Sequence, residues 1–361
     1  MIFRSEILEF TSLLWFKLAA GFLIAFIVTM IGIPSVVKLS RYKGLYDMPG
    51  DRTSHEVPTP RLGGTMIFAG IIISTLLLSV FGSVYVINCI VTGIVVLFFI
   101  GLKDDIVDLV PLKKAAGQLI AALIIVVLGD VRLDVFGTQS GHSVIAFSLD
   151  VCLSLLVVMT LINSINLIDG IDGLASGIGI IGSVFFGIWN ILNDNAPYAL
   201  LSFSLAGSLL AFTWFNVFSS KYKIFLGDTG SMIIGFLLAV FLIHFIRTNA
   251  ALPVSEKLAS APAIAFSVLV VPVFDTLRIC VVRLSHGRSI LRGDNNHIHH
   301  SVLKVSGTHL KATVIMLTVN ILLILFTYLA RNLGNLILII IMLAIASAIS
   351  IALHYFLIRK S

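Results

Sequence analysis

Charged residues are scarce in this chain. Asp, Glu, Lys and Arg make up 12% of its 361 residues, whereas soluble domains carry about 25%. Hydrophobic residues make up 58% and the mean hydropathy is +1.08. These values exclude an ordinary soluble protein and predict a polytopic membrane protein without a second, soluble domain.

Cysteine is also rare. Cys89, Cys152 and Cys280 lie far apart in apolar runs and form no metal-binding pattern. Isolated cysteines in such runs are typical of small buried residues. We therefore expect no metal site built on cysteine.

Long polar stretches are missing too, because apolar runs of membrane-spanning length follow one another along the chain. The sequence predicts an all-α fold, a polytopic transmembrane helix bundle of about 11 spans that forms a single integral membrane domain over residues 1–361. The expected spans lie near 14–38, 62–82, 84–102, 115–129, 144–164, 174–193, 197–217, 231–247, 260–282, 310–330 and 335–357.

The basic residues predict the orientation of these spans. An odd number of spans puts the two termini on opposite sides of the membrane. Of the 24 lysines and arginines, 18 fall on one side, counting the flanking helix ends. Because basic connections stay in the cytoplasm, the N-terminus is expected outside and the C-terminus inside. The cytoplasmic loops are then those near 39–61, 103–114, 165–173, 218–230 and 283–309, and they contain every acidic or histidine cluster described below.

The first cluster is KDDIVDL (103–109), which ends an apolar run and is followed by Lys113 and Lys114, two lysines that can neutralise phosphate charge. Adjacent carboxylates such as Asp104 and Asp105 repel each other and are costly near hydrocarbon, so they indicate a cation, a phosphate-bound metal or proton chemistry. Mg²⁺ is usually held by one or two carboxylates together with substrate phosphates. The alternative is a solvated loop at the membrane surface.

The second cluster is NSINLIDGIDGLASG (163–177). Asn163 and Asn166 are three residues apart, which places both amides on one helix face. Asp169 and Asp172 each precede a glycine, so the backbone can approach a ligand closely. A helix N-cap is the alternative for one of these residues, but two Asn and two Asp exceed what a cap needs.

The third cluster is KYKIFLGDTGSMIIG (221–235), in which Asp228 lies at an expected helix start. Helix N-termini favour anions, so Asp228 is either a cap or a metal ligand that bridges to phosphate. In addition, Asp275 and Arg278 lie three apart inside a span, which favours a structural ion pair or a role in the site equally.

The fourth cluster contains His297, His299 and His300, preceded by Arg288 and Arg292. A zinc site would need a fourth ligand, so diphosphate binding or proton transfer is favoured. An amphipathic surface segment is the alternative. Arg61, in the first cytoplasmic loop, could reach a phosphate, although a structural loop is the stronger interpretation there.

Together these motifs resemble the polyprenyl-phosphate N-acetylhexosamine-1-phosphate transferases over residues 40–310. The matching strings are KDDIVDL, NLIDGIDGLASG, FLGDTGS and DNNHIHH after PVFDTLRICVVRL, and TPRLGG (59–64) resembles the family's first cytoplasmic motif. The family transfers a sugar-1-phosphate from a UDP-sugar to a membrane polyprenyl phosphate, releases UMP and requires Mg²⁺. The resemblance implies Mg²⁺ as cofactor here, with Mn²⁺ as the alternative.

The resemblance also implies roles for individual residues. Asp104, Asp105 and Asp228 are expected to be catalytic, and Asp228 and Asp105 to hold the metal. The expected substrate-binding residues are Asn163, Asn166, Asp169, Asp172, Lys113, Arg61, Arg288, Arg292, His297, His299 and His300. Direct attack by the lipid phosphate and a two-step route through an aspartyl-phosphate both stay open.

The HIHH form is similar to the branch that transfers N-acetylglucosamine-1-phosphate and starts O-antigen, common-antigen or teichoic-acid synthesis. It implies undecaprenyl phosphate and UDP-N-acetylglucosamine as substrates, with another UDP-N-acetylhexosamine as the alternative. We expect a bacterial cytoplasmic-membrane enzyme that contacts the lipid bilayer and no nucleic acid; a homodimer stays open. A transporter is the alternative from another class, but it would carry ionisable residues in mid-span and internal repeats.

Overall fold

The protein was analysed as a computed structural model that describes residues 2–46, 58–78, 84–136, 143–285, 287 and 297–360. Within these ranges the regular structure is helical throughout. The helices are α1 (Ile2–Lys43), α2 (Gly63–Leu77), α3 (Val84–Val107), α4 (Pro111–Leu123), η1 (Ile124–Leu128), α5 (Val144–Ile168), α6 (Leu174–Leu192), α7 (Ala196–Thr213), η3 (Trp214–Phe218), α8 (Gly227–Ala251), α9 (Ala261–Val268), α10 (Val270–Ser285), α11 (Ile298–Ser306), α12 (His309–Leu329), η4 (Arg331–Leu333) and α13 (Asn335–Lys360).

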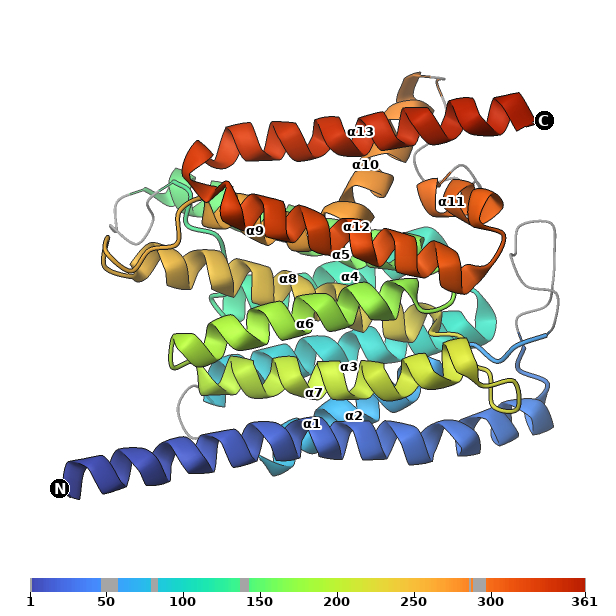
Figure 1. Cartoon of the computed structure of the whole chain (residues 1–361). Coiled ribbons are helices and arrows are strands. Elements are labelled where there is room, and N and C mark those ends of the chain that lie inside the picture. Colours follow the sequence, from blue (N-terminus) through green and yellow to red (C-terminus); the bar gives the residue numbers. More distant parts are fainter. Residues whose placement is uncertain are drawn as a thin grey trace.

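Most of these helices run side by side in one bundle, with α1 along one edge and α13 along the opposite edge (Figure 1). Among the described residues, nine helices are long and apolar enough to cross a membrane, and the bent pair α9–α10 makes a tenth; α2 is a shorter apolar helix. Each of the eleven expected segments coincides with one of these elements. The all-helical membrane fold is therefore confirmed.

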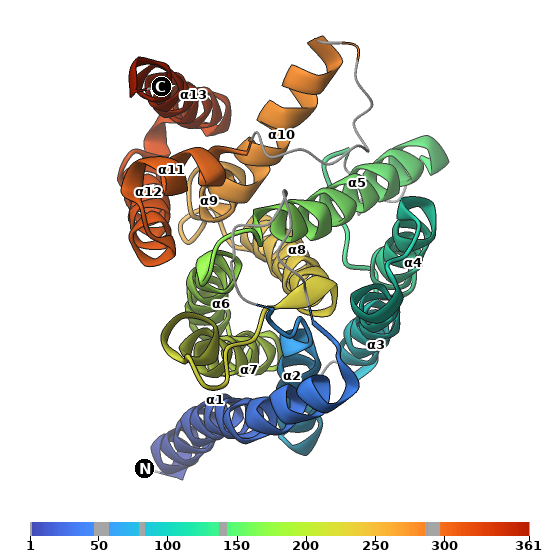
Figure 2. The ribbon, with the colours of Figure 1, turned by 90° about the vertical axis from the view of Figure 1, so that its right-hand side faces the viewer.

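Helix α8 forms the centre of the bundle, and the other helices surround it (Figure 2). In α8, 89% of an 18-residue apolar stretch is buried, against 17% in α13. Helices in lipid pack closely where small residues let their backbones approach. The outer helices expose apolar side chains instead, including Cys152 on α5, whereas Cys89 is buried.

The span expected near 260–282 is broken into two helices, because α9 and α10 meet at an angle of 80°. The physical reason is Pro272. It has no N–H, so the Val268 carbonyl, four residues earlier, loses its helical donor. The Nδ2 of Asn320 on α12 donates to that carbonyl instead, at 3.2 Å. In a membrane interior a freed backbone group needs such a replacement.

The structure differs from the sequence-based prediction in two further respects, both at the end of the bundle that faces the viewer in Figure 2. Helix α3 continues to Val107, so Asp104 and Asp105 belong to its last turns and do not follow it. The connection 283–309 contains a helix that the sequence did not predict, α11, which begins after His297. The ends of α3, α5 and α10 and the starts of α4, α8 and α11 bring polar side chains to this end.

Replacing Asn320 by Leu is expected to destabilise the protein, because the Val268 carbonyl then lies buried without a donor. Hydrogen bonds between membrane helices are worth about 0.6–2 kcal/mol, which lowers the melting temperature in detergent by a few degrees. Asn193→Leu is the matched control, because the Asn193 amide bonds within its own helix, to the Trp189 carbonyl. Equal melting temperatures for the two variants would contradict this account of the bend.

Candidate active site

The first turn of α8 is anchored by Asp105. One carboxylate oxygen accepts the Asp228 backbone N–H at 2.7 Å. The other accepts the backbone N–H of Thr229 at 3.1 Å and its hydroxyl at 2.6 Å. The first N–H groups of a helix have no partner inside the helix, and a carboxylate is a favourable cap for them. Both oxygens of Asp105 are thus occupied by α8.

Glycines make this close approach sterically feasible. Gly227 has a φ of +74°, and a Cβ there would lie 2.1 Å from the Arg61 carbonyl oxygen and 2.7 Å from an Asp105 oxygen. A Cβ at Gly64 would lie 2.1 Å from the Gly230 nitrogen. Only glycine fits either position. The start of α8 is therefore fixed from two sides, by α2 and by α3.

Asp104, next to Asp105 on α3, faces a different partner. One of its oxygens accepts the Leu109 backbone N–H at 2.5 Å, and the other lies 3.0 Å from the Lys114 ammonium. The same ammonium forms an ion pair with Asp228. Asn166 donates to Asp228 as well, and to the Ser231 hydroxyl at 2.8 Å. Four helices, α3, α4, α5 and α8, thus contribute to one polar cluster.

Asn163 lies one helical turn before Asn166 and also faces α4. Its Nδ2 donates to Oε1 of Gln118 at 3.1 Å and to the Met159 carbonyl at 2.7 Å. The expectation that both amides share a helix face is therefore confirmed. Because Gln118 is buried, Asn163 supports the cluster from within the bundle.

Asp169 caps the end of α5 next to this cluster. No hydrogen bond or ion pair from a described residue reaches its half-buried carboxyl. Burial, followed by the nearby charges of Asp228, Asp105 and Asp172, raises the pKa of Asp169 well above its ordinary value. A carboxyl with this surplus of neighbouring negative charge is suited to take up a proton or a cation.

Asp172 differs from Asp169 because it already has a cationic partner. The Lys223 ammonium lies 2.6 Å from one of its oxygens. Its backbone N–H donates to Nδ1 of His309 at 3.2 Å, and its carbonyl accepts the Thr313 hydroxyl at 2.7 Å. These contacts attach the turn between α5 and α6 to the start of α12.

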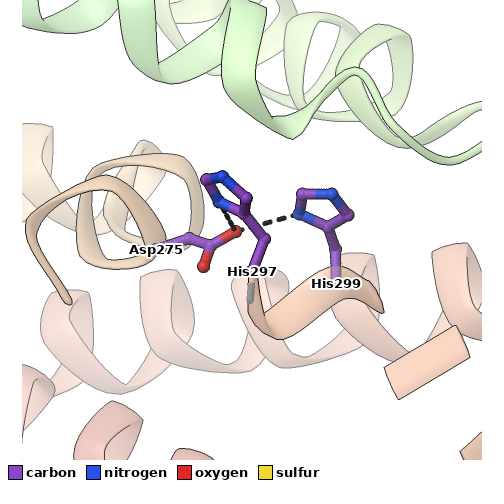
Figure 3. Close-up of side chains that lie close together, drawn as sticks. All are labelled: Asp275, His297 and His299. Carbon is purple, nitrogen blue, oxygen red and sulfur yellow. Dashed lines mark hydrogen bonds and ion pairs between the residues drawn. The ribbon is translucent and has the colours of Figure 1, made fainter. Parts of the chain in front are cut away.

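His297 and His299 share one partner, Asp275, and His299 also approaches the turn between α5 and α6. Both direct Nδ1 at a single oxygen of Asp275, at 3.2 Å and 2.9 Å (Figure 3). His299 reaches the turn at Gly170, where a Cβ would lie 2.8 Å from its Nε2. His300 is half-buried, and burial, followed by the charges of His299 and His297, lowers its pKa to about 4. His300 is therefore neutral near pH 7.

The remaining expected site residues lie outside this cluster. Lys113 is exposed, while its neighbour Lys114 holds the two carboxylates. Arg61 lies at the rim and pairs with Asp108 at 3.3 Å. Arg288 and Arg292 fall outside the described residues, so the expectation for them stays a prediction.

Three residues of the site were not in the set of site residues implied by the resemblance: Lys114, Lys223 and Asp275. A signal for Lys114 was available. Lys114 and Gln118 are four residues apart on a short amphipathic helix and so share its polar face. Asp275 had been expected to pair with Arg278 or to serve the site. It pairs with the two histidines and not with Arg278. This pairing depends on the bend at Pro272, which the predicted spans did not include.

The donor set of the cluster suits a hard divalent cation. Asp104 and Asp228 present carboxylate oxygens to a shared cation, the Lys114 ammonium, and Asn166 adds an amide oxygen 3.4 Å from that ammonium. Carboxylate and amide oxygens are the ligands that Mg²⁺ and Mn²⁺ prefer. Lys114 is the only described cation paired with Asp104 or Asp228, so negative charge remains in excess around Asp169.

Comparisons with known proteins point to one family. The model of glycosyl transferase family 4 matches residues 87–246. The chain is 32% identical over 327 residues to decaprenyl-phosphate N-acetylglucosaminephosphotransferase of Mycobacterium tuberculosis, which covers 83% of this chain and 79% of the relative. It is 26% identical over 301 residues to the probable undecaprenyl-phosphate N-acetylglucosaminyl 1-phosphate transferase of Bacillus subtilis, covering 83% and 81%. It is 27% identical over 297 residues to undecaprenyl-phosphate alpha-N-acetylglucosaminyl 1-phosphate transferase of Escherichia coli, covering 81% and 78%.

Loss of the charge at Asp105, which caps α8, and at Asp228, which belongs to the polar cluster, is expected to affect the stability of the fold differently. Asp105→Asn replaces one of the two acceptor oxygens by an NH2 group that faces N–H groups of α8, and should cost about 1–3 kcal/mol. Asp228→Asn retains the side-chain volume and an acceptor oxygen for Asn166, and Asp104 still pairs with Lys114, so it should change stability by less than about 1 kcal/mol. Melting temperatures of the two purified variants measure the difference. A variant at position 228 that is less stable than the one at 105 would contradict the assigned roles.

Asp169→Asn is expected to stabilise the ligand-free protein at neutral pH. An unfolded aspartate titrates near 3.9, whereas the folded pKa of Asp169 is raised. Between these two values the folded state binds more protons, so stability falls as pH rises through that window. The variant should therefore melt higher than wild type at pH 7, and the gap should close towards pH 4. Melting curves from pH 4 to 8 in EDTA test this, with Asp194→Asn, the same change at an exposed position, as the control.

Proposed function

The chain belongs to glycosyl transferase family 4, among the polyprenyl-phosphate N-acetylhexosamine-1-phosphate transferases, and on this premise we propose the reaction that it catalyses. The donor is UDP-N-acetylglucosamine, the acceptor is undecaprenyl phosphate, and UMP is released. The observation that carries the proposal is the convergence of Asp104, Asp228, Asn166 and Lys114 at one end of a membrane bundle. This arrangement combines cation-binding oxygens with a fixed ammonium, as a diphosphate substrate requires.

The proposed reaction is a single displacement at phosphorus. An oxygen of the lipid phosphate forms a bond to the β-phosphorus of the donor, and the bond from that phosphorus to the oxygen bridging the α-phosphorus breaks. UMP leaves with the bridging oxygen, and the lipid carries a diphosphate-linked sugar. A phosphate monoester is mostly dianionic at pH 7, since its second pKa is near 6. The acceptor therefore attacks without a strong base.

We assign the metal to Asp228 and Asp104, with Mg²⁺ as the ion and Mn²⁺ as a substitute. The sequence favoured Asp105 as the second ligand, but both of its oxygens hold the start of α8. When bound, the ion supplies positive charge to the phosphoryl oxygens on which negative charge builds up. The metal assignment thus moves by one residue, from Asp105 to Asp104.

The side chains of the cluster prepare the site for an anionic donor. The Lys114 ammonium offsets charge on a bound diphosphate, and its position is fixed by two carboxylates. Charged groups held in place before the reaction are the main source of catalysis in phosphoryl transfer. Asp169 takes up a proton more readily than an ordinary aspartate, because burial and its neighbours raise its pKa. The donor's sugar and uridine are assigned to the turn at 169–172.

We place this reaction on the cytoplasmic face of a bacterial cytoplasmic membrane. The support is the excess of lysine and arginine in the connections on the side that holds the site. The lipid acceptor reaches this end from the bilayer, and the UDP-sugar reaches it from the cytoplasm. The lipid-linked product is the type of molecule on which a cell-envelope polysaccharide is built.

The test is release of UMP from UDP-N-acetylglucosamine by detergent-purified protein with undecaprenyl phosphate and Mg²⁺. Activity should disappear in EDTA and return with excess Mg²⁺. Asp228→Asn and Asp104→Asn should each lower the rate by about 10²-fold or more. Glu256→Gln is the matched control, because it makes the same chemical change at an exposed position outside the site.

The outcomes separate the parts of the proposal. Activity only with a different UDP-N-acetylhexosamine would contradict the donor and leave the reaction class intact. Full activity in EDTA would contradict the metal. Absence of UMP release with every donor, from protein with a wild-type melting curve, would overturn the proposed reaction.

A further inference from the structure

Asp275 is a buried carboxylate that the proposed reaction does not use. It is 2% exposed, and the two histidines that contact it are 4% (His297) and 1% (His299) exposed. A buried charge is costly unless hydrogen bonds satisfy it. Asp275 accepts three: one oxygen receives the Ile298 backbone N–H at 2.9 Å, and the other receives both imidazoles.

The bend between α9 and α10 brings Asp275 into hydrogen-bond contact with the two histidines. Pro272 and Asn320 hold that bend, and Asp275 lies one turn further along α10. The Ile298 N–H belongs to the first turn of α11, with His297 as the residue that precedes the helix. One carboxylate thus caps α11 and holds two rings from the same segment, which fixes the position of α11 relative to α10.

The contacts also determine which nitrogen carries the proton. A carboxylate accepts hydrogen bonds and donates none, so the Nδ1 atoms that face Asp275 are protonated. The Nε2 atoms then point away from Asp275, as Figure 3 shows for both rings. For His299, Nε2 lies against Gly170, next to Asp169. A hydrogen bond at one ring nitrogen sets the behaviour of the other.

A metal site made of the same three residues is the competing interpretation. Their potential ligand atoms all lie within 4.8 Å of one another. However, the Nδ1 atoms that would bind a metal are those that donate to Asp275, and the second carboxylate oxygen is already occupied by Ile298. A protonated imidazole nitrogen has no lone pair for a metal. The arrangement is complete as a set of hydrogen bonds.

We infer that Asp275 is a positioning residue that fixes His297 and His299 in the Nδ1–H tautomer and aims their Nε2 atoms at the donor. This inference rests on the proposed function for the identity of the donor only. In this tautomer each Nε2 carries a lone pair, so it can accept a hydrogen bond from a hydroxyl or an amide N–H of the donor's sugar. Asp275 itself does not touch the substrate.

The first test does not depend on activity. Full-length protein is labelled with ¹⁵N-histidine, and the ring nitrogen shifts identify the protonated nitrogen of each ring, with His297→Gln and His299→Gln supplying the assignments. We expect both rings protonated at Nδ1 in wild type and at least one ring altered in Asp275→Asn. Rings protonated only at Nε2 in wild type would overturn the inference, even if the variant does not fold. Stoichiometric zinc in the purified protein would overturn it too.

The second test uses UMP release. Asp275→Asn should lower kcat/KM by about 10- to 100-fold, the range for partners that orient a functional histidine. Thr276→Val is the matched control, because among the described residues its hydroxyl bonds to the Pro272 carbonyl of the same helix and to no other group. In a His297→Gln/His299→Gln background, Asp275→Asn should lower the rate no further. An additional loss there would show that Asp275 acts on something other than the histidines. If wild type releases no UMP, the proposed reaction fails, while the ¹⁵N result still decides the role of Asp275.

Discussion

The attachment of the first turn of α8 to Asp105 is the contact on which the site depends. Helix α8 is the most buried of the candidate membrane spans, and burial in its first turn begins at Thr229, so the free N–H groups of that turn need partners from the protein. Asp105 supplies them from α3, and the glycines at 64 and 227 let α2 and α3 come close enough. Asp228 lies in this turn. Its position relative to Asp104 and Lys114 therefore follows from how α8 begins.

Adjacent residues on α3 acquire different roles from helix geometry alone. Successive side chains on a helix point about 100° apart. Asp105 faces α8, and both of its oxygens accept hydrogen bonds from the start of that helix. Asp104 faces α4 and forms an ion pair with the Lys114 ammonium. The pair of acids that looks redundant in the sequence is thus divided between structure and chemistry. The same division separates Asp172, which Lys223 ties to the turn between α5 and α6, from Asp169, which has no described cationic partner.

Much of this could be predicted from the sequence, since lipid restricts the chain to apolar helices and the alternation of spans brings every second connection to the same end. The gathering of the acidic and histidine motifs follows from that alternation. The roles of individual side chains do not, because they depend on rotations of helices about their axes. Lys113 and Lys114 look equivalent in the sequence, yet only Lys114 points to α5 and α8. The break at Pro272 could have been predicted from the sequence, because a proline in a helix frees a carbonyl four residues earlier. The side chain that donates to this carbonyl instead, Asn320, lies 52 positions further along than Val268 and could not be identified from the pattern.

The turn at 169–173 connects the two halves of the site. On one side it carries Asp169 towards the acidic cluster, and on the other Gly170 lies against His299. Asp172 ties the same turn to Lys223 and, through its backbone, to α12. A shift of α12 or α11 would therefore change contacts of this turn, at Asp172 or at Gly170. The turn thus lies between the two polar groups at this end of the bundle, the cluster at the start of α8 and the contacts of Asp275 after the bend in α10. A donor bound across the turn would touch both halves, which gives the protein a physical reason to fix α10 as firmly as α8.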